Sequence, residues 1–384
     1  MISTITHLEC PECGKQYSIE QAVSICVCGS PLFVRYDLSR VIDSIDCEEF
    51  PAPVNSMWRY SMVLPVASPS FILSLGEGWT PLVLTRRLGT HYGLRLLRIK
   101  DESRNPTLSF KDRGLCTAIS KHLELGATAV ALPSAGNAAV STSAYAAVGG
   151  IPAYIFMPKD TPRPFFEDCQ MYGAITSSNP GTISDSASAM KEKKGNWTDL
   201  STTKEPYRVE GKKTLAYEIA EQLGWSVPDA IVCPTGGGTA LIGIWKGLDE
   251  LESLGLIGNE RPRMYAAQSG GCAPVVRAFE NGTEIIEPWI NGETMAYGLR
   301  VPSPFAGRLI MRALYRSKGG AVAVADHEIA STMSIAAKLE GLDICPEAAV
   351  GLAGLSNLIE SGDIDYDEEI VVLNTGSGVK YRQT

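Results

Sequence analysis

The chain has 384 residues, of which 45% are hydrophobic, and a formal net charge of −9 at pH 7. This length and composition allow two α/β cores and suggest two or three domains, while the acidic balance argues against a nucleic-acid-binding surface. No apolar run approaches the roughly 18 residues of a membrane helix, and residues 1–7 lack the basic-then-apolar pattern of a secretory signal. We therefore expect a cytoplasmic protein that binds neither nucleic acid nor membrane.

Four of the ten cysteines cluster near the N-terminus, at Cys10, Cys13, Cys26 and Cys28. Cys-Pro-Glu-Cys-Gly is typical of a zinc knuckle, in which glycine lets backbone N–H groups point at sulfur. The pattern predicts a zinc-ribbon-like module over 1–35 with a structural zinc, because four thiolates leave no open position for catalysis. A metal-free ribbon remnant or a cluster of cytosolic thiols remains the alternative, and the six scattered cysteines fit reduced thiols.

Beyond this module, strand-like runs alternate with helix-length segments. The strand-like runs are 94–99, 127–132, 153–157, 230–233, 264–268, 321–324 and 370–373. Helical patterns cover 138–148, 213–223, 241–254, 328–339 and 347–359. The alternation predicts doubly wound, mainly parallel sheets with helices on both faces.

Lys111 follows an Asn-Pro pair and a polar run that break regular structure, so we expect it where a loop becomes a helix. The positive end of the helix dipole disfavours a cation at that point and favours the neutral amine that a Schiff-base nucleophile requires. A solvated helix-start lysine paired with Asp112 is the alternative.

A turn with the sequence Ser134-Ala135-Gly136-Asn137 separates the run 127–132 from the helix over 138–148. Glycine there lets the backbone approach a ligand closely, and the Asn137 amide is placed to face it. The alternative is a plain strand–turn–helix junction with Asn137 as the N-cap. Farther on, the polar stretch 177–204 is the best candidate for a mobile part over an active site.

A glycine cup, Gly236-Gly237-Gly238-Thr239, lies between the strand-like run 230–233 and the helix over 241–254. Three glycines before a helix leave several backbone N–H groups free to surround an anion, and the helix dipole adds to them. The pattern matches neither the Walker nor the Rossmann fingerprint. It predicts a phosphate site, with a merely tight turn as the alternative.

Lys111, the Asn137 turn and the glycine cup together indicate a pyridoxal phosphate site. That cofactor needs an amine for its aldehyde, a polar contact for its ring hydroxyl and a dock for its phosphate. Thr375, after the last strand-like run, is the candidate partner for the pyridine nitrogen. A hydroxyl there would not hold the pyridine protonated, which suits elimination and replacement at the side chain more than transamination.

These motifs resemble those of the threonine synthases, within the tryptophan-synthase-β-like (fold type II) pyridoxal phosphate enzymes. The matching segments are 57–60, 64–66, 75–82, 105–114, 134–137, 206–214, 234–240, 268–274 and 375–380. The resemblance implies a lyase of threonine biosynthesis that converts O-phospho-L-homoserine and water to L-threonine and phosphate. It also implies a homodimer, with a large cofactor-binding domain over 36–106 and 206–384, a small domain over 107–205, and the cofactor in the cleft between them.

The resemblance also assigns roles to residues. Lys111 would hold the cofactor covalently and later move protons, Asn137 would contact the ring oxygen, and Thr375 would face the pyridine nitrogen. The cofactor phosphate would lie against Gly236, Gly237, Gly238 and Thr239. The substrate, a small phosphorylated amino acid, would be bound by Arg208, with help from Ser134, Thr202 and Thr203.

Some positions depart from the family pattern. Leu108 replaces a common glycine, Thr202-Thr203 replaces an expected Asn-Ser pair, and Ser377 replaces a frequent histidine. The threonine pair leaves open β-replacement on O-phosphoserine, as in a cysteate synthase, or deamination of threonine or serine. Lys111 argues against a non-catalytic metabolite-binding protein, and the acidic balance against a zinc-ribbon nucleic-acid binder. Because no motif contains a histidine, the lysine and phosphate are the expected acid–base groups; the histidines are His7, His91, His122 and His327.

Overall fold

The computed structural model describes residues 3–193 and 195–382, which form two compact units. The first unit contains the described residues up to Trp79 together with Asn105–Thr214. The second unit contains Thr80–Arg104 together with the described residues from Leu215 onward. This division into two compact units does not test the three predicted domains. They stay a prediction, with the bounds 1–35, 36–106 together with 206–384, and 107–205.

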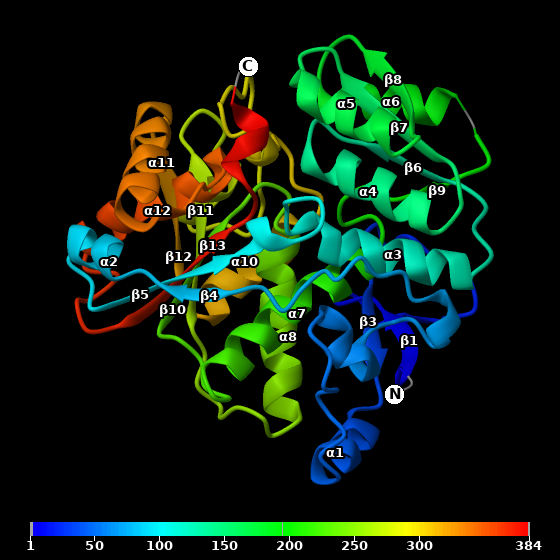
Figure 1. Cartoon of the computed structure of the whole chain (residues 1–384), viewed down its shortest axis with the longest axis horizontal. Helices are drawn as coiled ribbons and strands as arrows, with labels where there is room; N and C mark the ends of the chain where they lie inside the picture. Colours follow the sequence, from blue (N-terminus) through cyan, green and yellow to red (C-terminus); the bar gives the residue numbers. More distant parts are fainter. Residues whose placement is uncertain (1–2, 194, 383–384) are drawn as a thin grey trace. The chain divides into compact units, whose positions relative to one another are not determined.

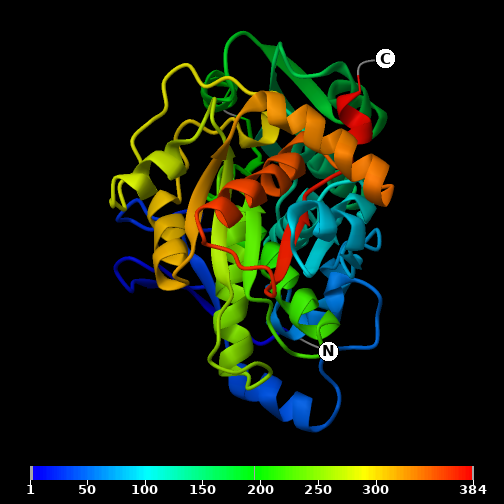
Figure 2. The same ribbon diagram turned by 90° about the vertical axis from the view of Figure 1, so that its left-hand side faces the viewer.

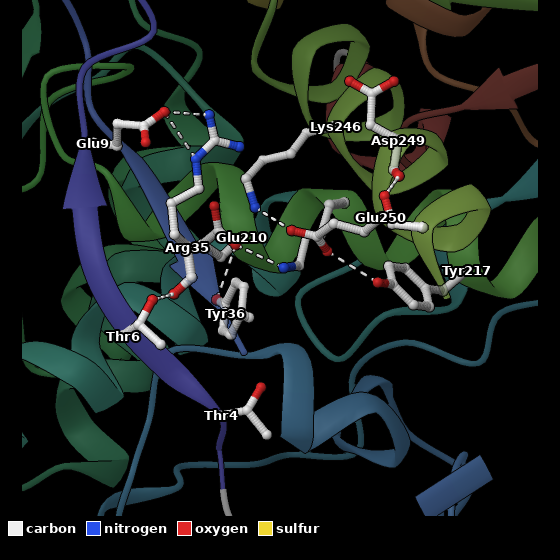
Figure 3. A network of polar contacts seen from close by, with 12 residues as sticks. Thr4, Thr6, Glu9, Arg35, Tyr36, Glu210, Tyr217, Lys246, Asp249 and Glu250 are labelled. Carbon is white, nitrogen blue, oxygen red and sulfur yellow. Dashed lines mark hydrogen bonds and ion pairs between the residues drawn. The ribbon is translucent and has the colours of Figure 1, made fainter. Parts of the chain in front are cut away.

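The first unit begins with a small antiparallel sheet of order β2-β1-β3. Its strands are β1 (Ile5–Glu9), β2 (Gln16–Tyr17) and β3 (Phe33–Tyr36), and helix α1 (Leu38–Asp46) follows. Arg35 on β3 pairs with Glu9 on β1 at 2.6 Å (Figure 3). The cysteine-bearing turns lie between these strands in the sequence.

A parallel four-stranded sheet of order β8-β7-β6-β9 forms the rest of the first unit (Figure 1). Its strands are β6 (Val130–Pro133), β7 (Ala153–Pro158), β8 (Ile175–Asn179) and β9 (Thr198–Asp199). The helices of this part are α3 (Lys111–Glu124), α4 (Asn137–Val148), α5 (Arg163–Met171) and α6 (Ile183–Glu192).

The second unit is built on a six-stranded sheet of order β12-β11-β10-β13-β5-β4, in which only β4 runs antiparallel to its neighbour. The strands are β4 (Leu82–Leu84), β5 (Leu96–Asp101), β10 (Ala230–Pro234), β11 (Arg263–Ser269), β12 (Gly320–Val324) and β13 (Glu369–Asn374). The helices are α2 (Arg86–Tyr92), α8 (Thr239–Ser253), α9 (Pro274–Glu280), α10 (Gly307–Arg316), α11 (Asp326–Glu340) and α12 (Pro346–Glu360).

The core of this unit lies between α12 and the sheet. Helix α12 packs along the central strands, as Figures 1 and 2 show, and its Val350, Leu352 and Leu355 are buried with Val232 of β10 and Val372 of β13. Burying these apolar side chains removes their surface from water, which favours folding. It also fixes the carboxyl ends of β10 and β13, where the glycine cup and Thr375 begin.

Helix α7 (Tyr207–Gln222) contains the boundary between the two units, and each of its residues from 207 to 220 is buried. Buried charges are costly unless they are paired. In the first unit, Glu210 pairs with Lys213 at 2.8 Å. Glu210 also accepts a hydrogen bond from the Tyr36 hydroxyl at 2.9 Å (Figure 3). In the second unit, Glu218 pairs with Lys100 at 2.7 Å.

The predicted fold class is confirmed, and each of the seven predicted strands is present with bounds that shift by no more than three residues. The helix predicted over 213–223 is wrong in its start, because α7 begins at Tyr207. Complete burial removes the polar-and-apolar periodicity that would have marked its first turns.

The stretch 177–204 contains more regular structure than its composition indicated. Helix α6 lies within it, with a capping box in which the side chains of Thr182 and Asp185 each bond the other's backbone. Its mobility stays a prediction. None of the helices in the described part of the chain is long and apolar enough to cross a membrane.

Candidate active site and metal centre

Lys111 is the first residue of α3, as predicted from the break before it. Its backbone N–H donates to the Ser109 hydroxyl at 3.2 Å, and its Nζ lies 4.8 Å from the centre of the Phe110 ring. The side chain is half-buried, in contrast to the fully buried residues that follow it. Lys111 thus lies at the start of a packed helix and is less buried than the residues that follow it.

Asp112 supports the start of this helix from inside the protein. Its two carboxylate oxygens accept hydrogen bonds from the Thr107 backbone N–H at 2.7 Å and from the Thr107 hydroxyl at 2.5 Å. Burial raises the pKa of the Asp112 carboxyl. Asp112 is fully buried and bonds the loop before the helix, and the role of Lys111 stays a prediction.

The loop that leads to Lys111 is fastened to the preceding Glu77 segment. The Asn105 side-chain oxygen accepts from the Gly78 N–H at 3.0 Å. Glu77 is fully buried and accepts from the Trp58 ring N–H and from the Tyr145 hydroxyl of α4, both at 2.7 Å. Burial raises the pKa of Tyr145 far above its ordinary value, so it remains a donor to this carboxylate.

Leu108 adopts a left-handed backbone conformation, with φ +60°. Residues with a Cβ rarely adopt this conformation, whereas glycine does so readily. The backbone at this position therefore still has the conformation that favours glycine, although the residue is leucine. Its side chain is 37% exposed, which places it at the surface of the loop.

The Ser134–Asn137 turn joins β6 to α4, as predicted. Ser134 is buried, and its backbone N–H donates to the Phe156 carbonyl of β7 at 3.0 Å. Gly136 is the N-cap of α4, so the alternative in which Asn137 is the N-cap is wrong. Asn137 is instead the first helical residue, close to the N-terminal end of the helix.

The glycine cup joins β10 to α8, and it leaves no room for a side chain at Gly236 or Gly238. Gly238 is the N-cap of α8 with φ +76°, and a Cβ there would lie 2.3 Å from the Ile310 side chain. A Cβ on Gly236 would lie 2.7 Å from the Gly298 carbonyl oxygen. The first N–H groups of α8 have no carbonyl partner inside the helix and lie at the positive end of this 15-residue helix.

Thr375 follows β13, which pairs in parallel with β10. The cup and Thr375 therefore leave the same edge of the sheet from neighbouring strands. The Thr375 hydroxyl lies 3.3 Å from the Cys345 sulfur, and both side chains are buried. Burial raises the pKa of Cys345 well above its ordinary value, so Thr375 has an uncharged neighbour.

Arg208 lies in the first turn of α7, where only 3% of it is exposed. Its guanidinium Nη1 donates to the Leu200 carbonyl at 2.6 Å. Within residues 3–193 and 195–382, no carboxylate forms an ion pair with this guanidinium. Burial lowers the pKa of Arg208 to about 10, which still leaves it charged at neutral pH.

Close packing of two helices brings Arg208 near the start of α3. A Cβ on Gly114 would lie 2.9 Å from the Arg208 carbonyl oxygen, and one on Gly211 would overlap the carbonyl oxygen of Arg113. Lys212 of α7 donates to the Phe110 carbonyl, next to Lys111. The structure thus gathers two predicted site residues, Lys111 and Arg208, on adjoining parts of the first unit.

The predicted threonine pair differs in its surroundings. Thr202 is exposed, whereas Thr203 is buried and has φ +59°. The Thr203 hydroxyl donates to the Thr202 carbonyl at 2.7 Å. Their role in substrate binding stays a prediction.

Sequence reasoning missed Glu205 and His122. Glu205 accepts hydrogen bonds from the first backbone N–H groups of α7, and His122 of α3 contacts it at 3.1 Å. An acidic residue just before a helix is a recognisable capping signal, which the late predicted start of α7 concealed. No local pattern marks His122, because its partner is 83 residues away in the sequence.

The four clustered cysteines converge on one point in the first unit. The sulfur atoms of Cys10, Cys13, Cys26 and Cys28 all lie within 4.8 Å of one another, and two of the pairs are 3.5 Å apart. The Tyr17 hydroxyl donates to the Cys26 sulfur at 3.1 Å. Gly14 and Gly29 close the two turns by donating to the carbonyls of Cys10 and Cys26. The predicted four-cysteine cluster is therefore confirmed as an arrangement of ligands suited to a metal ion.

Comparison with known proteins adds two kinds of similarity. A family model described as pyridoxal-phosphate dependent enzyme matches residues 73–376. The chain is 36% identical to a threonine synthase of Methanocaldococcus jannaschii over 97% of its own length and 92% of the relative. It is also 36% identical to a threonine synthase of Methanosarcina acetivorans, covering 98% of the chain and 93% of the relative.

Solved structures share the fold at lower identity. Maize serine racemase superposes with a TM-score of 0.68 at 23% identity, over 78% of this chain and 88% of the racemase. Threonine deaminase isoform 2 from Solanum lycopersicum gives a TM-score of 0.64 at 21% identity, over 84% of this chain and 89% of the deaminase. At these identities the likeness concerns the fold alone.

Proposed function

The chain belongs to the pyridoxal-phosphate dependent enzymes, within the family of the threonine synthases, and we propose that it converts O-phospho-L-homoserine and water to L-threonine and phosphate. The observation that carries the substrate assignment is the buried Arg208. On the same helix, Glu210 pairs with Lys213 and Glu218 pairs with Lys100, whereas the Arg208 guanidinium donates to a backbone carbonyl. A guanidinium without such a carboxylate partner suits an external anion, and its planar fork matches a phosphate group.

The residues present fit pyridoxal phosphate. The glycine cup offers the N–H groups of a helix N-terminus, which suits the phosphate of the cofactor, and Thr375 offers a hydroxyl for the pyridine nitrogen. When bound, the cofactor supplies an electron sink that makes the protons of an attached amino acid easier to remove. Asn137 would orient the ring through its amide, and the half-buried Lys111 would bind the aldehyde carbon.

Lys111 is also the group placed to move protons. Its position at the start of α3 keeps the amine at the edge of the packed core, where it can accept a proton from carbon and return it. Arg208 would bind the phosphate before it leaves and hold the released phosphate near the reacting carbons. Homodimer formation and a cytoplasmic location belong to the same proposal.

Replacing Arg208 tests the substrate assignment. Guanidinium-to-phosphate hydrogen bonds contribute roughly 1.5–3 kcal/mol each. Arg208→Leu should therefore raise KM for O-phosphohomoserine by about ten- to a hundredfold while the cofactor stays bound, because a separate cup holds the cofactor phosphate. Arg163→Leu, a change at an exposed arginine of the same unit, is the control and should leave KM unchanged. An unaltered KM in Arg208→Leu would contradict the proposal.

The four cysteines would hold a structural zinc. Tetrahedral coordination with Zn–S bonds of about 2.3 Å places sulfur atoms about 3.8 Å apart, close to the separations in the cluster. Metal analysis should find about one zinc per chain, lost in Cys10→Ser and Cys28→Ser, with the ribbon unfolding before the rest. Cys47→Ser, at an exposed cysteine outside the cluster, is the matched control. Protein purified without chelator that contains no stoichiometric metal would overturn this part.

A further inference from the structure

Glu205 is a buried carboxylate that lies beside Arg208 without pairing with its guanidinium. Its Oε1 accepts from the Tyr207 backbone N–H at 2.9 Å, and its Oε2 accepts from the Arg208 backbone N–H at 2.8 Å. These N–H groups have no partner inside the helix, so Glu205 caps α7 and interacts favourably with its dipole. Both oxygens are thus committed to the backbone that carries Arg208.

His122 holds this carboxylate from the other side. Its Nε2 lies 3.1 Å from Glu205 Oε1, and because a carboxylate only accepts, Nε2 carries the proton. Among the described residues, no group hydrogen-bonds to His122 Nδ1, which is buried. The Tyr207 ring packs edge-on against the imidazole at 5.3 Å. The one side-chain hydrogen bond of this buried histidine therefore goes to Glu205.

Asp199, the second carboxylate whose charge acts on Arg208, is held by Ser201 through one of its two oxygens. Its Oδ1 accepts from the Ser201 backbone N–H at 2.8 Å and from the Ser201 hydroxyl at 2.5 Å. Two negative charges thus offset the charge of the buried arginine from nearby, yet among the described residues neither carboxylate pairs with its guanidinium. This arrangement is unexpected for a structural arginine, since a buried guanidinium gains most from direct pairing with a carboxylate.

We propose that His122 and Glu205 are positioning residues for the substrate's phosphate. His122 prevents Glu205 from turning toward the guanidinium, and Glu205 fixes the first turn of α7, so that Arg208 keeps its hydrogen-bond donors for the phosphate. The inference rests on the proposed function, because it takes Arg208 as the residue that binds substrate. His122 and Glu205 would thus contribute to substrate specificity, although both lie outside the sequence motifs.

The test uses the holoenzyme and a matched pair of His122 variants. His122→Leu removes the donor to Glu205, whereas His122→Gln places an amide N–H near the position of Nε2. His122→Leu should raise KM for O-phosphohomoserine at least fivefold with kcat within twofold of wild type, and His122→Gln should restore KM to within twofold. Tyr207→Phe is the control, because no described group hydrogen-bonds to the buried Tyr207 hydroxyl, and it should match wild type.

A binding measurement separates positioning from turnover. With the cofactor site saturated by pyridoxal phosphate, added inorganic phosphate should raise the thermal midpoint of wild type and of His122→Gln more than that of His122→Leu. If His122→Leu does not fold, Glu205→Gln takes its place. Its amide nitrogen cannot accept, so at least one bond to the start of α7 is lost, and KM should rise at least fivefold.

Two results would overturn the inference. The first is equal damage in His122→Gln and His122→Leu, which would show that the imidazole acts by its shape. The second is wild-type KM in His122→Leu, or in Glu205→Gln where that variant replaces it, while Arg208→Leu shows the expected loss. A wild-type KM in Arg208→Leu itself would instead refute the proposed function.

Discussion

The glycine cup and the surroundings of Arg208 are both suited to a phosphate, but they are built from different parts of the chain. In the second unit, the cup consists of backbone N–H groups at the start of α8, where a Cβ on Gly236 or Gly238 would collide with its neighbours. In the first unit, Arg208 brings a buried positive charge that Glu205 and His122 hold in place. A site built from backbone N–H groups depends on the absence of side chains at neighbouring positions of the sequence. A site built from a side chain depends on partners far away in the sequence.

The largest expected effect is the loss of turnover in Lys111→Ala, a variant that leaves both phosphate sites unchanged. Lys111→Ala removes the amine but none of the groups in the cup or around Arg208, so the fold should persist and turnover should cease. Activity of the purified variant, measured without added amine, should fall below a few per cent of wild type. A higher residual activity would show that another group acts as the base, and the division of labour between the two sites and Lys111 would need revision.

A substitution in the cup should weaken cofactor binding alone. Gly238→Ala places a Cβ against Ile310 and forces a left-handed backbone on alanine, so the affinity for pyridoxal phosphate should fall at least tenfold in an absorbance titration. Gly224→Ala is the matched control, because Gly224 has φ +72° but open space around it. Its cost should be limited to about 1 kcal/mol of unfolding free energy. Equal cofactor affinity in Gly238→Ala and wild type would contradict the steric account of the cup.

The smallest expected effect concerns Leu108, whose left-handed backbone favours glycine. Leu108→Gly relieves a strain of roughly 1–2 kcal/mol but gives the unfolded chain about 0.5–1 kcal/mol of extra conformational freedom. The free energy of unfolding, measured with denaturant, should therefore change by no more than about 1 kcal/mol. A larger loss would show that the leucine side chain packs in a way that its exposure does not indicate.

The sequence predicted the cup and the strands around it because their signals are local. An apolar run, three glycines and a helical pattern lie in order from Ala230 to Ser253, and each element forms where the pattern placed it. Lys111 was likewise located by the break before α3. The four-cysteine cluster was visible from spacing alone, since its two pairs belong to two short turns.

The environment of Arg208 could not be predicted in this way. Helix α7 is buried on all sides, so no periodicity marked its start, and Glu205 therefore did not stand out as its cap. His122 reaches Glu205 only because α3 packs against α7, with Gly114 and Gly211 allowing close approach. Tertiary packing, rather than any local propensity, creates this arrangement.

The most direct test of the central claim is a comparison of substrates on the wild-type enzyme. O-phosphohomoserine, O-phosphoserine and threonine should be offered separately, with release of phosphate and of ammonia measured for each. The account predicts rapid phosphate release with threonine formed from O-phosphohomoserine, and little ammonia from any of the three. Preference for O-phosphoserine by a large margin, or ammonia release from threonine as the main reaction, would contradict it.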